Sequence, residues 1–183
     1  MRGRKAPHPD GALPDMPEPL HLRPQTDADR TFLAALYTST RAQEMAVVPW
    51  TDEQKQAFCQ WQFESQSSHY AENYAKADFL IIEQEGTAIG RLYIDRGPME
   101  IEIVDIALLP EYRGSGLGAG LLRDILREGE ESGKPVTIYV EHFNPARHLY
   151  DRLGFQHVDT NGVYHLMKWM PAGVDPGVDP AEA

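Results

Sequence analysis

The stretch LLPEYRGSGLGAGLLRDIL (residues 108–126) places Gly114, Gly116 and Gly118 at alternate positions after Arg113. Apolar residues at helical spacing follow the glycines, which predicts that a helix begins among them. The first turn of a helix carries unpaired backbone N–H groups and the positive end of the helix dipole, and glycines let an anion approach that backbone closely. The segment therefore predicts a site for a di- or polyphosphate, in which Arg113 either adds a charge or anchors the loop.

Two other phosphate-binding motifs fit this segment less well. A P-loop needs a lysine followed by serine or threonine after its last glycine, and this stretch has neither. The dinucleotide pattern G-x-G-x-x-[GA] does match at Gly114, Gly116 and Ala119, but in that fold the motif follows the first strand. A turn whose glycines serve packing alone is a further alternative, although three glycines weaken a helix for no structural gain that the sequence reveals.

Composition limits the class of protein. The chain has 183 residues, of which 42% are hydrophobic and 25% charged, as in a globular domain long enough to bury a core. The net charge of −11 argues against a general nucleic-acid-binding protein, because phosphate contacts need a basic surface. An acidic surface favours cationic substrates such as amines, or serves solubility alone.

The sequence also indicates where the protein is located and whether it binds a metal. Prolines interrupt the basic N-terminal segment where an export signal needs an apolar stretch, and no apolar run approaches the about 20 residues of a membrane span. We therefore expect a cytoplasmic protein without a membrane partner. Cys59 is the only cysteine and is expected to be a buried small residue. The seven histidines are scattered without ligand spacing, so no metal is expected.

Hydrophobic periodicity and turn residues predict elements in the order β-α-α-β-β-β-α-β-α-β-β. The β-α-β unit over 100–141 predicts a parallel pair with a right-handed crossover, whereas the hairpins predict antiparallel pairs. The expected fold class is α/β (α+β), with a mixed, mostly antiparallel central sheet and helices on both faces. Strands are expected over 20–24, 78–97 (a hairpin turning at EQEG), 99–110, 135–141, 155–159 and 163–169 (a hairpin around Thr160–Asn161–Gly162), and helices over 26–39, from Thr51, from the glycines to Gly133, and over 144–154.

The two ends of the chain differ from the middle in composition. Residues 1–19 are rich in proline and glycine, and residues 171–183 repeat GVDP. Both segments are expected to be disordered tails. The single folded domain is expected to cover residues 20–170.

Two segments resemble signatures of the GNAT superfamily, the acyl-CoA-dependent N-acyltransferases. RGSGLG (113–118) fits the pyrophosphate-binding signature R/Q-x-x-G-x-G/A, and NPARHLYDRLGF (144–155) resembles a downstream segment of the family. The expected element order from 20 to 169 is similar to the order in that family. The resemblance implies a GNAT-like fold and an N-acetyltransferase without metal. Such an enzyme would pass an acetyl group from acetyl-CoA, its cosubstrate, directly to a primary amine in a ternary complex.

The resemblance also implies where the cosubstrate would lie. In this family the strand before the glycines and the strand after the next helix splay apart, and the pantetheine arm lies between them. Backbone groups of Ile106, Ala107 and Leu108 would pair with that arm, and one N–H there would stabilise the oxyanion. Asn144 would position the arm, cap the helix that follows, or both. The pyrophosphate would be held by the backbone of Arg113, Gly114, Ser115, Gly116, Leu117 and Gly118.

Catalytic roles follow from the same resemblance. Tyr150 matches the family's tyrosine general acid, which would protonate the departing thiolate; a purely structural tyrosine is the alternative. The amine must lose a proton, because alkylamines are mostly protonated at neutral pH. Glu102 best resembles the strand glutamate that acts as base, directly or through water.

Other acidic groups near that strand leave alternatives open. Two-residue alternation puts Glu100 and Glu102 on one face of the strand and Asp105 on the other, unless a bulge intervenes. Solvated charges with no catalytic role would also explain acids on this strand. Glu141 and His142, just past the next strand, form a reserve pair that would face the acceptor.

The resemblance further implies that the acceptor, a small-molecule or peptide amine, is bound mainly by residues 26–77, in which Arg41 and Glu44 have no assigned role. Aromatic residues in that range either line a pocket or pack on the sheet. An alternative function is that of a non-catalytic acyl-CoA-binding sensor or partner module. A homodimer formed through edge strands within 155–169 also stays open. The aromatic residues in question are Tyr37, Trp50, Phe58, Trp61, Phe63, Tyr70 and Tyr74.

Overall fold

The computed structural model of the chain describes residues 20–173, so the tail expected at 1–19 and residues 174–183 of the tail expected at 171–183 lie outside the described residues. The elements follow the predicted order. The strands are β1 (His21–Pro24), β2 (Asp78–Gln84), β3 (Thr87–Arg96), β4 (Ile101–Leu108), β5 (Val136–Glu141), β6 (Gln156–Asn161) and β7 (Tyr164–Trp169). The helices are α1 (Arg30–Ala46), α2 (Asp52–Asn73), α3 (Leu117–Ser132) and α4 (Arg147–Arg152), with short 3-10 turns at Asp27–Asp29 and Pro110–Tyr112.

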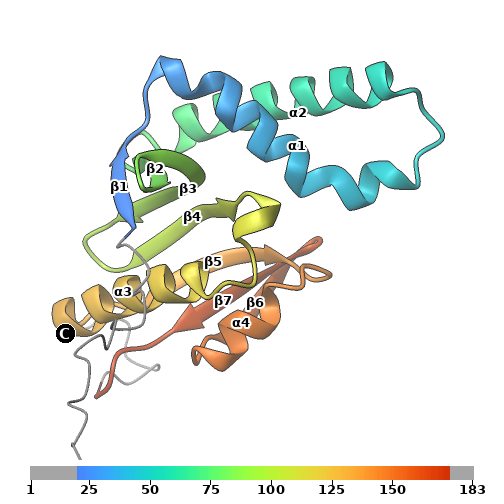
Figure 1. The fold of residues 1–183 in the computed structure, drawn as a ribbon. Helices are drawn as coiled ribbons and strands as arrows, with labels where there is room; N and C mark the ends of the chain where they lie inside the picture. The colour runs from blue at the N-terminus through green and yellow to red at the C-terminus, as the bar shows by residue number, and fades with distance from the viewer. Residues whose placement is uncertain (1–19, 174–183) are drawn as a thin grey trace, which may run out of the picture.

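One sheet runs through the molecule in the order β1-β2-β3-β4-β5-β7-β6. Of the strand pairs within residues 20–173, β4 with β5 is parallel and the others are antiparallel, which confirms the predicted mixed, mostly antiparallel sheet. Helices α1 and α2 cover one face, and α3 and α4 cover the other (Figure 1). Ile81 and Ile82 are neighbours on β2 and point to opposite faces. Ile81 packs with Leu33 and Phe63 of the first helix pair, whereas Ile82 joins the larger cluster under α3.

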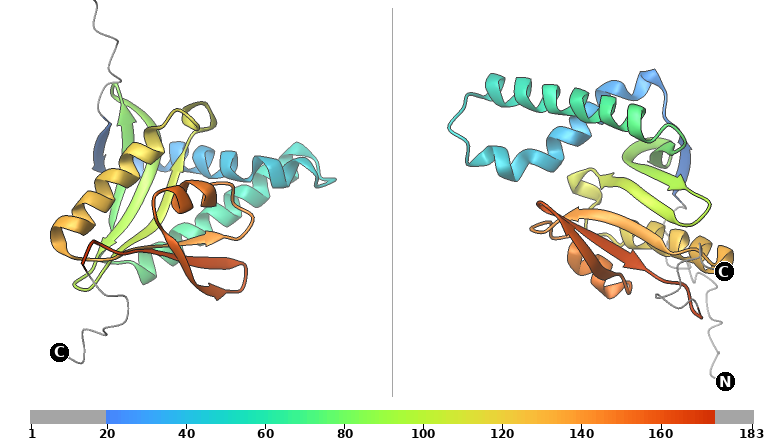
Figure 2. Two further views of the ribbon diagram at one scale, coloured as in Figure 1. Left: turned by 90° about the horizontal axis from the view of Figure 1, so that it is seen from below. Right: turned by 180° about the vertical axis from the view of Figure 1, so that it is seen from behind.

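Helices α1 and α2 form a long antiparallel pair whose connected ends extend beyond the sheet (Figures 1 and 2). Helix α1 continues to Ala46, past the predicted end at 39, because the added residues are mostly good helix formers. Thr51 caps α2 as predicted: its hydroxyl accepts from the Gln54 N–H, and the Gln54 side chain accepts from the Thr51 N–H. Cys59 lies between the two helices and is 1% exposed, which confirms that it is buried.

The two hairpins differ in how well their turns were predicted. Strands β2 and β3 are joined at Glu85–Gly86, inside the predicted EQEG turn. In the last hairpin Asn161 pairs with Tyr164, so the turn is Gly162–Val163, and Thr160 and Asn161 belong to β6 instead. Gly162 has a φ of 60°, and two-residue hairpin turns need such a left-handed residue.

The close approach of β3 to β4 yields a stability prediction. A Cβ added at Gly90 would lie 2.7 Å from Leu108 Cδ2 and against the carbonyl oxygen of Ala107. Gly90→Ala should therefore displace β4 and lower the free energy of unfolding by about 1–3 kcal/mol. As a control, Gly120→Ala in α3 should raise it by about 0.5–1 kcal/mol, because alanine favours helix. Within residues 20–173, nothing lies within 4 Å of a Cβ added at Gly120. Urea unfolding of both variants measures the difference, and a Gly90→Ala protein as stable as wild type would contradict the packing.

Candidate active site

Strands β4 and β5 pair over a short length and then part. Their ladder joins Ile101 with Val136 and Ile103 with Ile138, and the recorded pairing ends there. Beyond that point β4 continues to Leu108 while pairing with β3, and β5 continues to Glu141 while pairing with β7. Within residues 20–173, the edge of β4 that faces β5 therefore has no strand partner past Ile103. This divergence is hereafter called the gap.

A β-bulge marks the point where the gap begins. Tyr93 pairs with Asp105 and Ile94 with Ile103, so Val104 is an extra residue on β4. The bulge shifts the alternation by one residue, and it puts Asp105 on the same face as Glu102, under α2. The prediction that these two acids lie on opposite faces, made for a strand without a bulge, is therefore wrong for this strand.

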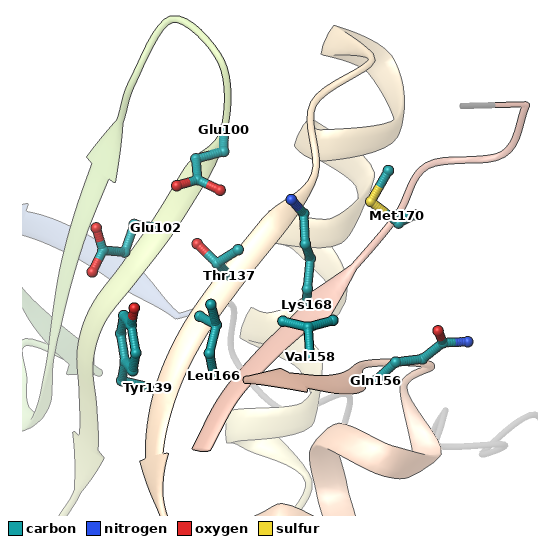
Figure 3. Close-up of a pocket in the computed structure, with 9 residues that line it drawn as sticks. All are labelled: Glu100, Glu102, Thr137, Tyr139, Gln156, Val158, Leu166, Lys168 and Met170. Atoms are coloured by element: carbon teal, nitrogen blue, oxygen red, sulfur yellow. The ribbon is translucent and has the colours of Figure 1, made fainter. Parts of the chain in front are cut away.

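Glu102 is half-buried beneath α2. The Tyr74 hydroxyl donates to Glu102 Oε1 at 3.1 Å. Burial raises the pKa of Glu102, an effect that the Tyr74 bond opposes and that the neighbouring charge of Glu100 adds to. Glu100 and Glu102 line a pocket of about 370 Å³ whose other lining residues come mainly from β5, β6 and β7 (Figure 3). The rest of its lining is Thr137, Tyr139, Gln156, Val158, Leu166, Lys168 and Met170.

Asp105 is held by a buried ion pair. Arg91 Nε donates to Asp105 Oδ2, and Arg91 Nη2 donates to Gln66 Oε1 of α2 at 2.8 Å. Arg91 is 3% exposed, so its charge needs this partner. Sequence reasoning did not identify Arg91 or Gln66, because one arginine in an alternating strand shows neither its depth nor its partners.

Tyr150 lies on α4 at the opposite face of the sheet. Its side chain is 4% exposed and packs edge-on against Phe155, with ring centroids 5.6 Å apart. Burial raises the pKa of Tyr150 well above its ordinary value, and the negative charge of Asp105 adds to that shift. The phenol therefore stays protonated at neutral pH, as a general acid must before it donates.

The glycine turn forms the start of α3. Gly114 and Gly116 have φ values of 72° and 89°, in the left-handed region that favours glycine. Among the described residues, nothing lies within 4 Å of a Cβ added at either position, so the turn is open. The first N–H groups of α3 have no intrahelical acceptors, so this helix start can accept an anion.

Arg113 anchors this loop. Its Nε donates to the Leu108 carbonyl at 2.7 Å, and its Nη2 donates to Ser39 Oγ of α1 at 3.1 Å. Of the two roles considered for Arg113, these bonds correspond to anchoring. Asn144 Oδ1 accepts from the Ala146 N–H at 2.9 Å in the turn that precedes α4. Helix α4 itself begins only at Arg147, with Ala146 at its N-cap position, so the prediction that Asn144 caps this helix is wrong.

Glu141 and His142, the reserve pair, lie at the end of β5. Glu141 Oε1 is 3.5 Å from Nη1 of Arg41 in α1, and the His142 backbone N–H donates to the Val163 carbonyl.

The aromatic residues of 26–77 are partly core and partly exposed. Tyr37 and Phe63 are buried in the core, and the Tyr70 ring packs edge-on against Tyr93 of β3. By contrast, Trp50 and Trp61 are 43% and 62% exposed, and the rings of both lie near the Phe58 ring.

Within residues 20–173, no group of three or more His, Cys, Asp or Glu side chains is arranged to hold a metal ion. None of the helices in that part of the chain is long and apolar enough to cross a membrane.

Comparison with known proteins agrees with the fold and the motifs. Residues 22–155 match the model of the Acetyltransferase (GNAT) family. A [ribosomal protein bS18]-alanine N-acetyltransferase of Haemophilus influenzae is 30% identical over 115 residues, 62% of this chain and 76% of that protein. A putative enzyme of the same description from Bacillus subtilis is 30% identical over 131 residues, 67% of this chain and 79% of that protein.

Solved structures show the same fold at lower identity. The PaiA N-acetyltransferase of Thermoplasma acidophilum, in complex with coenzyme A, is 18% identical and superimposes with a TM-score of 0.63 over 83% of this chain and 99% of that chain. The ribosomal-protein-S18-alanine N-acetyltransferase of Escherichia coli is 20% identical, with a TM-score of 0.55 over 87% of this chain and 99% of that chain.

The raised pKa of Glu102 generates a pH-dependent prediction. When folding raises the pKa of a carboxyl, the free energy of unfolding falls as pH rises through that pKa, because burial penalises the charged form. Glu102→Gln removes the charge and keeps an oxygen that accepts from Tyr74. Its melting temperature should exceed that of wild type near neutral pH, and the difference should vanish below the ordinary glutamate pKa of 4.5. Thermal melts across that range measure it; a variant less stable than wild type at neutral pH would contradict the burial penalty.

Proposed function

The chain belongs to the GNAT family of acetyltransferases, and we propose from that premise that it transfers an acetyl group from acetyl-CoA to a primary amine in a ternary complex. The observation that carries the proposal is the gap between β4 and β5, with the open glycine turn at its end. An extended chain with a pyrophosphate at one end matches that combination of a strand edge and a helix start.

The cosubstrate is proposed to lie along the edge of β4. Backbone groups of Ile106, Ala107 and Leu108 would pair with the pantetheine arm as a strand does, and those of residues 113–118 would bind the pyrophosphate. The positive φ values of Gly114 and Gly116 and the space around them support this placement. Asn144, in the turn that precedes α4, would position the arm from the other side of the gap.

Tyr150 and Glu102 are proposed to move the two protons of the reaction. Glu102 takes a proton from the acceptor ammonium, directly or through water, and the raised pKa of Glu102 suits that task. As the C–N bond forms and the C–S bond breaks, Tyr150 gives its proton to the thiolate, and the second proton, which the nitrogen sheds on becoming an amide, passes to the Tyr150 phenolate through water. A backbone N–H of residues 106–108 would stabilise the oxyanion. Glu141 is the alternative base, although Arg41 already engages its carboxylate.

The acceptor is proposed to be an amine held on the α2 side of the gap. Relatives 30% identical to this chain are named for acetylating the alanine of ribosomal protein bS18, so a protein α-amine is the first acceptor to test. Cys59 supports direct transfer without a cysteine intermediate, because it is buried between α1 and α2 and burial raises the pKa of its thiol.

Cosubstrate binding is tested by thermal protection. Acetyl-CoA or CoA at 100 times its Kd should stabilise wild type by about 2.7 kcal/mol, whereas NAD and ATP should not. Gly116→Asp should abolish the protection, because its side chain and charge enter the anion site. Gly133→Asp is the matched control, since Gly133 also has a left-handed φ (66°) and ends the same helix. Equal responses of the two variants to CoA would contradict the assignment of the glycine turn.

Catalysis is tested by Tyr150→Phe. This variant should lose about 10²–10⁴-fold in kcat, the usual worth of a general acid, while keeping its protection by CoA. The acceptors should include an alanine-terminated peptide, a lysine peptide, a diamine and an aromatic amine. CoA protection without turnover of any amine would instead favour the non-catalytic acyl-CoA-binding module.

A further inference from the structure

Helix α1 is fastened to both strands that border the gap. At the β4 side, Ser39 Oγ accepts from Arg113 Nη2 at 3.1 Å, and Arg113 Nε donates to the carbonyl of Leu108, the last residue of β4. At the β5 side, Arg41 Nη1 lies 3.5 Å from Oε1 of Glu141, the last residue of β5. Ser39 and Arg41 are two residues apart, so one turn of α1 reaches the ends of both strands.

The position of Arg41 is fixed by several contacts. Its Nε donates to the Tyr37 hydroxyl at 3.3 Å, and that hydroxyl donates to Gln62 Oε1 of α2 at 3.0 Å. Its Nη1 also donates to Glu44 Oε1 at 2.8 Å, a bond within α1. The Arg41 side chain is 22% exposed, so the ion pair with Glu141 is shielded more than a typical surface pair.

The gap needs such a support because its walls are otherwise joined only at one end. Five residues of β4 follow Ile103, which is roughly 16 Å of strand at the usual rise per residue. Along that length β4 and β5 are held by different partners, β3 and β7. A small change in the angle between β4 and β5 would displace their far ends, at Leu108 and Glu141, by much more than it would displace the paired residues at Ile103 and Ile138.

We propose that α1 is a clasp that sets the separation of β4 and β5, with Arg41 as its positioning residue. The inference rests on the proposed function, because it assigns the acyl thioester to the gap. It follows that an anion bound at residues 113–118 acts on the loop that Arg113 ties to α1. Binding of the cosubstrate would thereby order the part of α1 around Ser39 and Arg41.

Arg41→Met and Glu44→Gln form the test pair. Arg41→Met breaks the link to Glu141, whereas Glu44→Gln removes only the partner within α1. Arg41→Met should lower kcat by roughly ten- to hundred-fold, the effect of a misplaced reacting group, with the Kd of CoA little changed. Arg41→Lys should recover part of the loss, and Glu44→Gln should resemble wild type.

Hydrogen exchange distinguishes the clasp from a role of Arg41 in stability alone, because stability alone would not link amide exchange in α1 to CoA binding. Addition of CoA should slow amide exchange at residues 113–120 in every variant, but at residues 36–46 of α1 only in wild type and Glu44→Gln. Ser39→Ala breaks the other end of the clasp and should lose the same response, with Thr38→Ala, whose hydroxyl bonds within α1, as its control. If Arg41→Met does not fold, kcat and α1 exchange are measured on Ser39→Ala instead.

The outcomes separate the two proposals. A wild-type protein that neither binds CoA nor acetylates any amine defeats the proposed function. A wild-type protein that does both, while Arg41→Met and Ser39→Ala match it in kcat and in α1 exchange, overturns the clasp alone.

Discussion

The structure depends on the point at which β4 stops pairing with β5. The extra residue Val104 shifts the alternation of β4 there, and the recorded ladder to β5 ends at Ile103. Two properties follow from this one break. An edge of β4 faces the gap, and Asp105 joins Glu102 on the face under α2.

The fold keeps polar groups near the gap at a cost in stability. Arg91 is almost fully buried with Asp105, and a buried ion pair returns little net stability, because desolvation offsets the attraction. Glu102 is half-buried with Tyr74 as its partner, and its raised pKa measures the burial penalty. Meanwhile the apolar cluster under α3, which includes Leu122, Ile125 and Val136, provides the hydrophobic burial that offsets such costs. Sites that must hold charges in particular positions commonly show this division.

The sequence predicts the order of elements and the sheet class because hydrophobic periodicity and glycine placement are local signals. It also identifies the glycines as the start of α3, since that role depends on neighbouring residues, whereas α4 begins at Arg147, later than the predicted cap at Asn144. The bulge at Val104 could not be predicted, because it depends on the register with β3 and no residue type marks it. The contacts of Arg91 with Gln66 and of Arg113 with Ser39 join residues far apart in the chain, and their partners appear only once α1 and α2 are placed over the sheet. For the same reason Arg41 had no assigned role until Glu141 was seen beside it.

The edge of β4 that borders the gap has a consequence for aggregation. A row of backbone N–H and C=O groups without a strand partner attracts other chains, and most proteins block such rows with charges, prolines or bulges. Here the row lies inside the molecule, between the layer of α1 and α2 and the layer of α3 and α4 (Figure 2). The ends of β4 and β5 are also tied to α1, which hinders a strand of another chain from pairing with this edge, so the edge is a poor template for fibrils.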